Sequence, residues 1–462
     1  MVQAQGADPA RIPRRVWGFA VSIALLAPLV AGAKSLESVP VSPEGAITAG
    51  AVLASDDVGG GGWYNPAALG AVSRSSIQVG ASAYAESATV IHDAAQVALP
   101  WGTVSGDIKS LRYSSVPSVL SYAFRLREGL GVSIGVWTPY HDYDGGSVTV
   151  TSAGAYPSSP YTSATYAQTY AFTERRDDTW GGVGVGWQAT SRLRIGAMLQ
   201  GAYSTDVWTV DLNASLATNT GSSSDSGSHV VYSERGDGGV LGLRTLLGAQ
   251  LQVTDRLRLA AAVRGPTIRL YAWGPVDKSL SFAVLMPAVS PAAQGQTATE
   301  QRPARGVSAI EPVRLYFGGR WAKDRWTLAV EGDWHPALDG EFGVFHAGWN
   351  GRAGGTRQLD PDLTLGAGLF LDSASTEASA TAGSLRYTGF TSGAIYRPSK
   401  VVKALRGSNE WDLLTAVAVR GAYGWGSYRG VYLAPIDPSV RFPDRSTRTF
   451  EGSISFFTTI MF

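Results

Sequence analysis

The sequence predicts an all-β fold, a transmembrane antiparallel β-barrel of about fourteen strands, and three observations lead to this prediction. The chain ends in a strand on which Ile454, Phe456, Ile460 and Phe462 share one face and alternate with more polar residues. Hairpins with the same alternation recur along the chain. Only 16% of the residues are charged, against about 25% in ordinary soluble proteins. Alternation with so few charges is typical of strands that face lipid on one side.

The first element of the chain is a predicted signal peptide over residues 1–33. Three arginines lie among the first fifteen residues, an apolar stretch covers residues 16–30, and residues 31–33 form a small-residue cleavage site. The alternative is a membrane anchor, but the apolar run has borderline length and contains Pro28. We therefore expect the mature chain to begin near Lys34, and the lack of Cys fits an oxidising compartment.

Four hairpins with short turns are predicted in the middle of the chain. In the first, residues 120–126 and 130–136 alternate between apolar and small or polar side chains on either side of a turn at residues 127–129. The other hairpins turn at residues 190–191, 254–255 and 323–324. Long polar loops are expected between the hairpins, over residues 138–178, 211–235 and 276–311. Short turns on one side and long loops on the other are typical of outer-membrane barrels, whose short turns lie in the periplasm.

Further strands bring the count to about fourteen, an even number of the kind that barrel closure favours. They are predicted near residues 75–85, 341–349, 363–371, 386–396, 411–421 and 448–462. The alternative, a soluble β-helix or β-sandwich, is disfavoured because the hairpins are unevenly spaced, no repeat of fixed period occurs, and Arg and Gln fall where a dry core would be.

Aromatic residues near the predicted strand ends suggest a girdle at the membrane interface. They are Trp137, Tyr140, Trp180, Trp187, Trp321, Trp326, Trp334, Trp349, Trp411 and Trp425. The alternative is ordinary strand composition, because aromatic residues favour strands in any protein.

Residues 34–73 precede the first strand and do not alternate. The segment is rich in Gly and Ala and contains Ala54-Ser55-Asp56-Asp57 and, after a run of glycines, Asn65-Pro66-Ala67. Pro66 fixes its own φ and restricts Asn65 to extended geometry, while the Asn side chain can bond nearby backbone. Taken alone, the tripeptide is also compatible with a simple turn.

With these motifs the chain resembles the long-chain fatty-acid transporter family of bacterial outer membranes, the FadL/TodX type. The resemblance extends to residues 263–266, to Glu311-Pro312 and to the aromatic last residue, Phe462, which we expect to act as the membrane-insertion signal. It implies that the N-terminal segment, including Asn65, Pro66 and Ala67, is a hatch folded inside a fourteen-stranded barrel. The expected division is a signal peptide at 1–33, a hatch at 34–74 and a barrel at 75–462.

One of the predicted loops contains an apolar patch, although a loop of this kind should be exposed. Exposed apolar clusters usually mark a binding surface. In the resembled family, loops of this region form a first hydrophobic landing site; the alternative is that the patch packs over the barrel mouth. The patch comprises Leu280, Phe282, Val284, Leu285, Met286, Pro287 and Val289, and Phe282, Leu285 and Met286 are the candidates for substrate contact.

Eight arginines fall on the strand face opposite the apolar one: Arg125, Arg194, Arg244, Arg258, Arg264, Arg314, Arg320 and Arg420. An Arg beside an apolar cavity can hold a carboxylate through a bidentate pair. Most of them are expected to pair with acids such as Glu331, Asp333 or Asp412. Arg264 lies where it resembles an Arg of the family, before the long loop, and is the candidate for binding a substrate carboxylate.

No catalytic, cofactor or metal site is predicted. The five His residues have no ligand spacing and no nucleophile motif accompanies them. The glycine run precedes no Lys-Ser or Lys-Thr, and Asp360-Pro361-Asp362 more often forms a solvated loop than an ion site. A net charge of +1 gives no reason to expect nucleic acid.

The predicted function is passive uptake of hydrophobic molecules, long-chain fatty acids or aromatic hydrocarbons, across an outer membrane. Its partners would be that hydrophobic small molecule and the outer-membrane lipid, and we expect a monomer. Two alternatives stay open: a nonspecific porin for small polar solutes, and a surface adhesin or structural barrel.

Overall fold

The computed structural model describes most of the chain from residue 40 onward. The described ranges are 40–99, 101–155, 162–219, 226–286, 289–301, 305–340, 343–373, 376–377, 385–398, 411–429, 431–432 and 444–462. The predicted signal peptide and residues 34–39 lie outside them. No helix in these ranges has the length and apolar character needed to cross a membrane.

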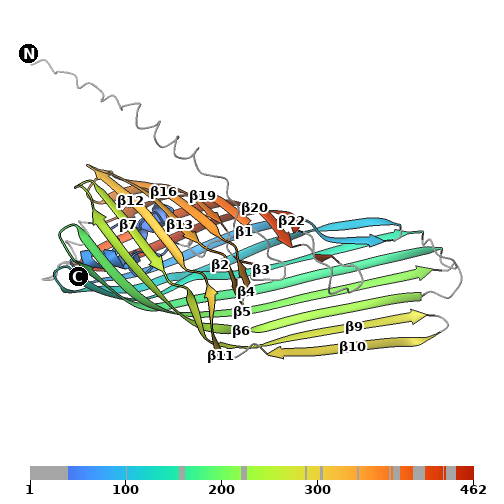
Figure 1. The fold of residues 1–462 in the computed structure, drawn as a ribbon. Coiled ribbons are helices and arrows are strands. Elements are labelled where there is room, and N and C mark those ends of the chain that lie inside the picture. The colour runs from blue at the N-terminus through green and yellow to red at the C-terminus, as the bar shows by residue number, and fades with distance from the viewer. Residues whose placement is uncertain are drawn as a thin grey trace, which may run out of the picture.

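Fourteen antiparallel strands form a closed barrel, as the sequence predicts (Figure 1). The last strand pairs with the first, from Ser76 opposite Met461 onward, which closes the cylinder. The strands are β1 (Ser76–Leu99), β2 (Gly102–Arg127), β3 (Leu130–Gly154), β4 (Ser163–Gln188), β5 (Leu193–Asn219), β6 (Ser226–Gln252), β7 (Leu257–Arg264), β12 (Arg314–Lys323), β13 (Trp326–His335), β16 (Gly348–Gln358), β17 (Leu363–Ser373), β19 (Leu385–Tyr396), β20 (Asp412–Arg429) and β22 (Asp444–Met461).

The outer face of the barrel wall is apolar, because alternate side chains of each strand point outward. Leu120, Ile134, Val183, Leu199 and Leu247 are among the residues that remain half exposed on this face. Aromatic side chains lie at both of its margins. Trp187, Trp321, Trp326, Trp411 and Phe462 are exposed near the short turns, and Tyr203, Tyr271, Trp349 and Phe450 are exposed toward the other end.

The prediction of an aromatic girdle is wrong for two of its residues. Trp137 and Trp180 are fully buried and face each other as register partners of β3 and β4. Both have the opposite parity to the outward-facing Val136 and Val183, so the alternation of the strand directs them into the barrel.

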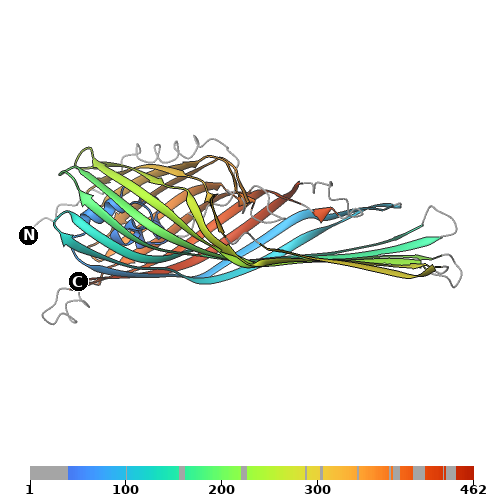
Figure 2. The same cartoon turned by 60° about the horizontal axis from the view of Figure 1, so that its bottom comes forward.

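The long loops expected over residues 138–178, 211–235 and 276–311 are largely strands. β1 to β6 contain 24 to 27 residues each, whereas about ten residues suffice to cross the hydrocarbon of a membrane. They continue past the barrel and, with added strands, form a long projecting sheet (Figure 2). The added strands are β8 (Thr267–Trp273), β9 (Pro275–Met286), β10 (Val289–Gln301) and β11 (Arg305–Glu311).

The strand predicted near residues 341–349 is also displaced. The barrel strand at this place is β16, which begins at Gly348 and has four glycines and one alanine that obscure its alternation. The short strands β14 (Leu338–Gly340), β15 (Gly343–Phe345) and β18 (Thr376–Glu377) form a small separate sheet, and β21 (Val431–Tyr432) pairs with β1.

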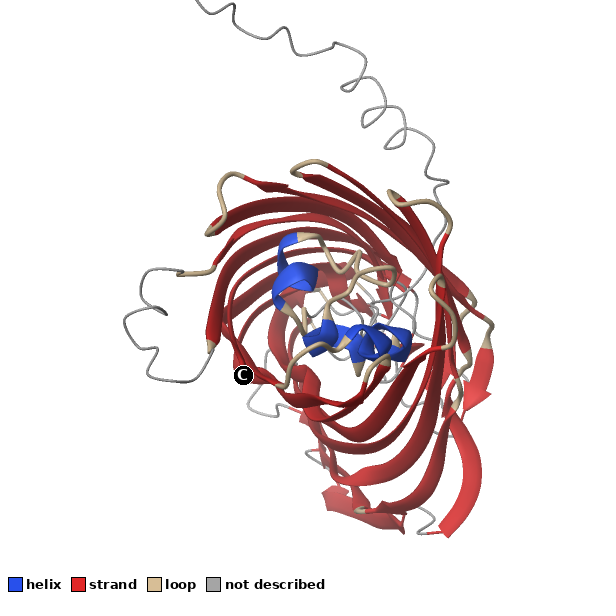
Figure 3. Cartoon of the chain, turned by 90° about the vertical axis from the view of Figure 1, so that its left-hand side faces the viewer, coloured by secondary structure: helices blue, strands red, loops and turns tan. Residues whose placement is uncertain are grey.

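Residues 40–74, called here the lumenal segment, lie inside the barrel (Figure 3). The segment contains α2 (Pro43–Ile47), α3 (Val58–Gly61) and the 3-10 helix η2 (Pro66–Ala71). Each helix starts at a polar cap: the side chains of Ser42, Asp57 and Asn65 accept hydrogen bonds from Gly45, Gly60 and Ala67 backbone N–H groups. Almost all of the segment is buried, so it belongs to the packed interior of the barrel.

Candidate functional site: the lumenal segment and the barrel interior

The Asn65-Pro66-Ala67 motif lies against a row of glycines in the wall. Gly186, Gly196 and Gly248 are register partners on β4, β5 and β6. A Cβ at Gly196 would come within 2.3 Å of Pro66 C, and a Cβ at Gly248 within 1.9 Å of Asn65 Oδ1. The motif can approach the wall this closely only because these positions lack side chains.

Helix α2 packs against a second glycine-rich part of the barrel wall. A Cβ at Gly366 or Gly393 would meet Ile47 at 2.6 Å, and one at Gly354 or Gly368 would meet the Thr48 backbone at 2.5 Å. These glycines lie on β16, β17 and β19. The lumenal segment is therefore held between two glycine-lined parts of the wall.

Polar side chains of the wall hold the backbone between the helices. Glu331 accepts hydrogen bonds from the backbone N–H groups of Val52 and Leu53 at 3.1 and 3.0 Å. Gln250 donates to Leu53 O at 3.0 Å and to Ser55 O at 2.7 Å. The Asn65 side chain links Leu53 O to Ala249 O, at 2.9 and 3.3 Å.

Glu331 also belongs to a buried network of ion pairs. Arg352 Nη1 lies 3.2 Å from Glu331, and Arg352 Nη2 lies 3.4 Å from Asp333 and 3.8 Å from Asp372. Arg314 approaches Asp333 at 3.3 Å. Buried charges persist only when they are paired in this way.

Ion pairs hold the lumenal segment at the end with the short turns. Asp56 pairs with Arg258 at 2.6 Å and also with Arg194. Glu44 lies 3.5 Å from Arg320. Burial raises the pKa of Asp56, but the two guanidinium groups outweigh this effect and lower it below its ordinary value.

A polar cavity of about 260 Å³ opens at the same end, between the lumenal segment and the wall. Glu44, Arg320, Asp324, Asp362 and Arg397 are among the residues that line it. The predicted loop at Asp360 is a turn, in which Asp360 Oδ1 accepts from the N–H groups of residues 362 and 363.

Asp57 differs sharply from its neighbour Asp56. Its Oδ1 accepts from Gly60 N at 3.2 Å, whereas its Oδ2 is buried with no hydrogen-bond partner among the described residues. Burial, together with the nearby Glu44 carboxylate, raises the pKa of Asp57 to about 6.

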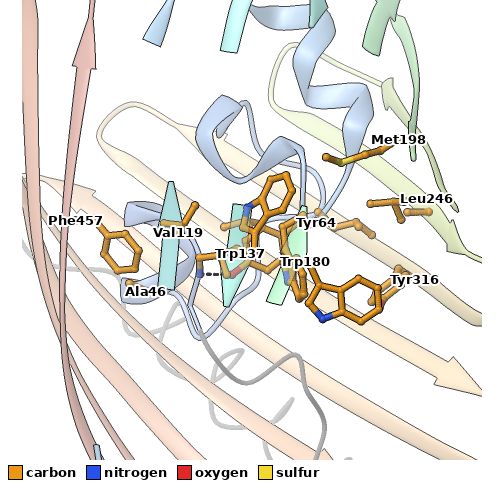
Figure 4. Packing of buried hydrophobic residues seen from close by; sticks show 14 of the residues in the cluster. Ala46, Tyr64, Val119, Trp137, Trp180, Met198, Leu246, Tyr316 and Phe457 are labelled. Atoms are coloured by element: carbon orange, nitrogen blue, oxygen red, sulfur yellow. Dashed lines mark hydrogen bonds between the residues drawn. The ribbon is translucent and has the colours of Figure 1, made fainter. Parts of the chain in front are cut away.

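Aromatic and arginine side chains form a buried layer beside the lumenal segment, and Figure 4 shows Trp137, Trp180 and Tyr316 of this layer. We call Trp63, Trp137, Trp180, Arg244, Arg264 and Tyr316 the aromatic–arginine layer; all six are buried. The Trp63 ring centroid lies 6.2 Å from that of Trp137 and 6.4 Å from that of Trp180. The guanidinium of Arg244 lies 3.3 Å from the Trp180 centroid, and that of Arg264 lies 5.0 Å from the Trp63 centroid.

This layer is rich in hydrogen-bond donors. The indole N–H groups of Trp63, Trp137 and Trp180 and one Arg244 nitrogen, Nη2, are buried without an acceptor among the described residues. Arg244 Nε donates to Gln200, and Arg264 Nη2 donates to Trp63 O at 3.2 Å. Because buried donors normally have partners, the layer has the chemistry to take an acceptor from water or from a ligand.

The structure places the candidate substrate residues in two separate regions. Arg264 ends β7 inside the barrel, where it contacts Trp63 of the lumenal segment. Phe282, Leu285 and Met286 lie on β9 of the projecting sheet, where Phe282 is the register partner of Val230. Sequence reasoning missed Trp63, Gln250 and the role of Glu331, although the inward parity of β6 and β13 contained a signal for the last two.

No protein-family model matches the sequence, and no curated protein matches it. Solved structures do resemble it. The crystal structure of a Pseudomonas aeruginosa FadL homologue superposes with a TM-score of 0.57 and 12% sequence identity, covering 94% of this chain and 99% of that chain. The Pseudomonas putida toluene transporter TodX gives 0.49 and 13%, covering 92% and 99%, and the CymD monoaromatic hydrocarbon channel gives 0.46 and 11%, covering 92% and 98%.

At such low identity the likeness concerns the fold, and the agreement is strongest with the first of these structures. Nearly the whole of both chains superposes, and both the strand count and the interior position of the N-terminal segment were expected from the sequence resemblance. The chain has the fold of the Pseudomonas aeruginosa FadL homologue, and this fold is a closed fourteen-stranded β-barrel.

Proposed function

We propose that this protein is an outer-membrane channel for the passive uptake of hydrophobic molecules, either long-chain fatty acids or aromatic hydrocarbons. The observation that carries the proposal is the lumenal segment. It fills the barrel interior and is held there by hydrogen bonds, ion pairs and glycine contacts rather than by covalent links. A segment held in this way can shift to let cargo pass, whereas an open porin would leave its lumen free.

The proposed organisation follows from this function. Residues 1–33 are a signal peptide, residues 34–74 form the hatch with Asn65, Pro66 and Ala67 against the wall, and residues 75–462 form the barrel of a monomer. Phe462 is the membrane-insertion signal; its exposed ring stacks near Tyr122, and its N–H donates to Ser75 O at 2.9 Å. Cargo moves down its own gradient, since no nucleotide or ion motif is present in the sequence.

Cargo first meets apolar residues of the projecting sheet, including Phe282, Leu285 and Met286 on β9. It then passes into the barrel toward the aromatic–arginine layer. There the indole rings can contact the apolar part of the cargo, and Arg264 can pair with a carboxylate. The solved structure with the same fold is described as a FadL homologue, and the sequence motifs resemble the same family of long-chain fatty-acid transporters; both support a hydrophobic cargo.

Replacing Arg264 with Ala should weaken the binding of oleate by about 1.5–3 kcal/mol, because the substitution removes a charge-assisted pair. Methyl oleate, which lacks the charge, should bind both forms equally. Calorimetry in detergent measures both ligands, and Arg125→Ala, at an exposed position near a short turn, is the matched control. Equal oleate affinity in the variant would remove Arg264 from the site, and a loss for both ligands would indicate a structural effect.

Reconstitution in liposomes tests the function itself. The purified protein should accelerate the entry of oleate or toluene and should pass little steady current in a planar bilayer. Entry no faster than in protein-free liposomes would contradict the proposal. A large steady current with uptake of polar solutes would favour the nonspecific porin.

A second function is favoured by one observation, the projecting sheet. Strands β3 to β6 contain 25 to 27 residues each and therefore extend far beyond the barrel. Such a projection suits attachment to a partner at the cell surface. Shortening these strands would abolish attachment and spare uptake if the protein is an adhesin.

A further inference from the structure

The outward face of the barrel strands changes its chemistry where the strands leave the barrel. β4 and β5 pair without a register shift from end to end, so residues of one parity stay on one side throughout. On β5 this side carries the exposed Ile195, Leu199 and Tyr203 within the wall. Farther along, the same side carries Asp211 and Asn213, which are exposed. The outer face thus passes from apolar to polar along a single strand.

Beyond the barrel, the outer face of β3, β4 and β5 consists mainly of short hydroxyl and amide side chains. Each of them is exposed or half-buried. They are Ser147, Thr149, Thr151, Thr165, Thr169, Thr173, Thr209, Asp211, Asn213 and Ser215, and we call this set the hydroxyl face. Asp211 is the charged member of the set; nearer the barrel, the same side of β4 also carries Arg175 and Asp177, which neutralise each other in an ion pair at 2.9 Å.

The hydroxyl face is regular and stiff. Thr149, Thr169 and Asn213 are register partners on three neighbouring strands, so they form a straight row across the sheet. Neighbouring strands lie about 4.8 Å apart, and residues on one face repeat about every 6.7 Å along a strand. Hydrogen bonds between Thr149 and Thr169, at 3.2 Å, and between Thr173 and Thr209, at 2.6 Å, restrict side chains that are already stiff at χ1. Little side-chain entropy is therefore lost when this face binds a ligand.

The opposite face of the same strands is covered. Val148, Tyr170 and Phe172 are buried in a cluster with Ile91 and Ile108 from the β1–β2 hairpin. Trp101 of this hairpin donates to Ser152 on β3 at 2.9 Å. Since this inner face is packed, the hydroxyl face is the side of the projection that is open to its surroundings.

We propose that the hydroxyl face binds the neutral sugar chains of the lipopolysaccharide in the protein's own outer membrane. The face continues directly from the lipid-facing wall, so its surroundings are those that lie just above the hydrocarbon in the outer leaflet. Every Ser and Thr hydroxyl both donates and accepts, which matches the hydroxyls of a sugar, and the low charge of the face suits an uncharged glycan. The inference rests on the proposed function only for the outer-membrane location.

The probe is a neutral O-chain released from smooth lipopolysaccharide by mild acid, with dextran sulfate as a charged glycan for comparison. Saturation-transfer NMR on the detergent-solubilised full chain should show transfer from wild-type protein to the O-chain and far less to dextran sulfate. The triple variant Thr149→Val, Thr165→Val, Thr169→Val keeps the branched shape and removes three hydroxyls, so the O-chain affinity should fall about tenfold or more.

Three controls make the result specific. The same residues changed to Ser keep their hydroxyls and should retain binding. The triple variant Thr327→Val, Thr356→Val, Thr364→Val, located at the polar cavity of the opposite end, should also retain it. Asn213→Ala with Ser215→Ala removes polar groups from β5 without adding branched apolar surface, and should weaken binding even if the first triple variant does not assemble.

The proposal is overturned if wild-type protein shows no transfer to the O-chain, if the Val triple variant at residues 149, 165 and 169 binds as tightly as wild type, or if dextran sulfate binds equally well. Oleate entry into liposomes that lack lipopolysaccharide should be the same for wild type and this variant. Failed oleate entry with intact O-chain binding would remove the proposed cargo and leave this inference standing.

Discussion

Two adjacent carboxylates of the lumenal segment have opposite environments, and this difference acts at the scale of single residues. Asp56 lies between Arg194 and Arg258, which keep it ionised. Asp57 turns toward the helix α3 that it caps and toward Glu44, and one of its oxygens has no partner among the described residues. One side chain therefore holds the segment through its charge, whereas the other is held best when it is neutral.

The sign of the pH dependence follows from the two shifts. The pKa of Asp57 is raised to about 6 from 3.8, so its contribution to stability is fully present below pH 3.8 and is lost as the pH rises through about 6. The pKa of Asp56 is lowered, so its contribution is present above pH 3.8 and is lost only at more acidic pH. Between pH 3.8 and 6, Asp57 is the one of these two groups that changes.

We therefore expect the lumenal segment to be held more firmly at pH 5 than at pH 7.5. Hydrogen exchange of the α3 and η2 amides, corrected for the intrinsic pH effect, should show greater protection at pH 5. Asp57→Asn should remove this difference, because an amide remains neutral at both values, whereas Asp324→Asn at an exposed turn should leave it unchanged. Equal protection of the wild type at both values would contradict the account of Asp57.

At the scale of elements, turns and barrel hairpins were predictable because their signals are local. The predicted turn at residues 127–129 contains Gly129 at φ +69°, and the turn at 323–324 contains Asp324 at φ +54°. Each depends on two or three neighbouring residues, which the sequence displays directly. The alternation of the strands between such turns is equally visible.

The projecting strands were mistaken for loops for a physical reason. Outside the membrane the outer face is polar, so stretches such as residues 147–155 and 209–219 lack the outward Leu and Val that reveal a barrel strand. Their inner faces still alternate, with Val148 and Val150 on β3 and Val210 and Leu212 on β5. In the sequence, the polar outer residues of these stretches suggested loops and masked their two-residue alternation. In the structure, the stretches form strands because they hydrogen-bond to neighbouring strands.

The candidate site was only partly predictable, because it depends on contacts between distant parts of the chain. Asn65, Pro66 and Ala67 stood out by motif, but the row of Gly186 and its partners is defined by the register of three strands. Nothing local distinguishes these glycines from the many others in the chain. Their role appears only when the lumenal segment lies against them.

Gly196→Ala tests the glycine row as an element. The new Cβ would meet Pro66 at 2.3 Å, so the lumenal segment must shift away from β5 while the barrel pairing is kept. We expect raised protease sensitivity of residues 52–71 and a larger bilayer current. Gly201→Ala on the same strand is the matched control, since its Cβ would meet one backbone atom at 3.9 Å. If Gly196→Ala has the same protease sensitivity and bilayer current as this control, the close approach of Pro66 to β5 is not needed to hold the lumenal segment in place.

At the scale of the whole molecule, the protein inverts the usual distribution of polarity. Leucines, valines and aromatic rings cover the outside of the barrel, while Arg244, Glu331, Asp333 and Arg352 are buried within it. This distribution is stable only if the outside meets hydrocarbon and the inside is satisfied by its own polar partners. The projecting sheet then marks where the hydrocarbon ends, because its outer face is no longer apolar.

Spin labels along the outward side of β5 can locate that boundary. The chain has 0 Cys, so single-Cys variants at residues 195, 199, 203, 209 and 213 can be labelled without background. In liposomes, labels at 195 and 199 should be relaxed by oxygen, which concentrates in lipid, whereas labels at 209 and 213 should be relaxed by a water-soluble nickel complex. The label at 203 lies at an aromatic margin and should respond to both. Nickel accessibility at 199 that equals that at 213 would contradict the membrane placement, and with it both the proposed channel and the position of the hydroxyl face above the hydrocarbon.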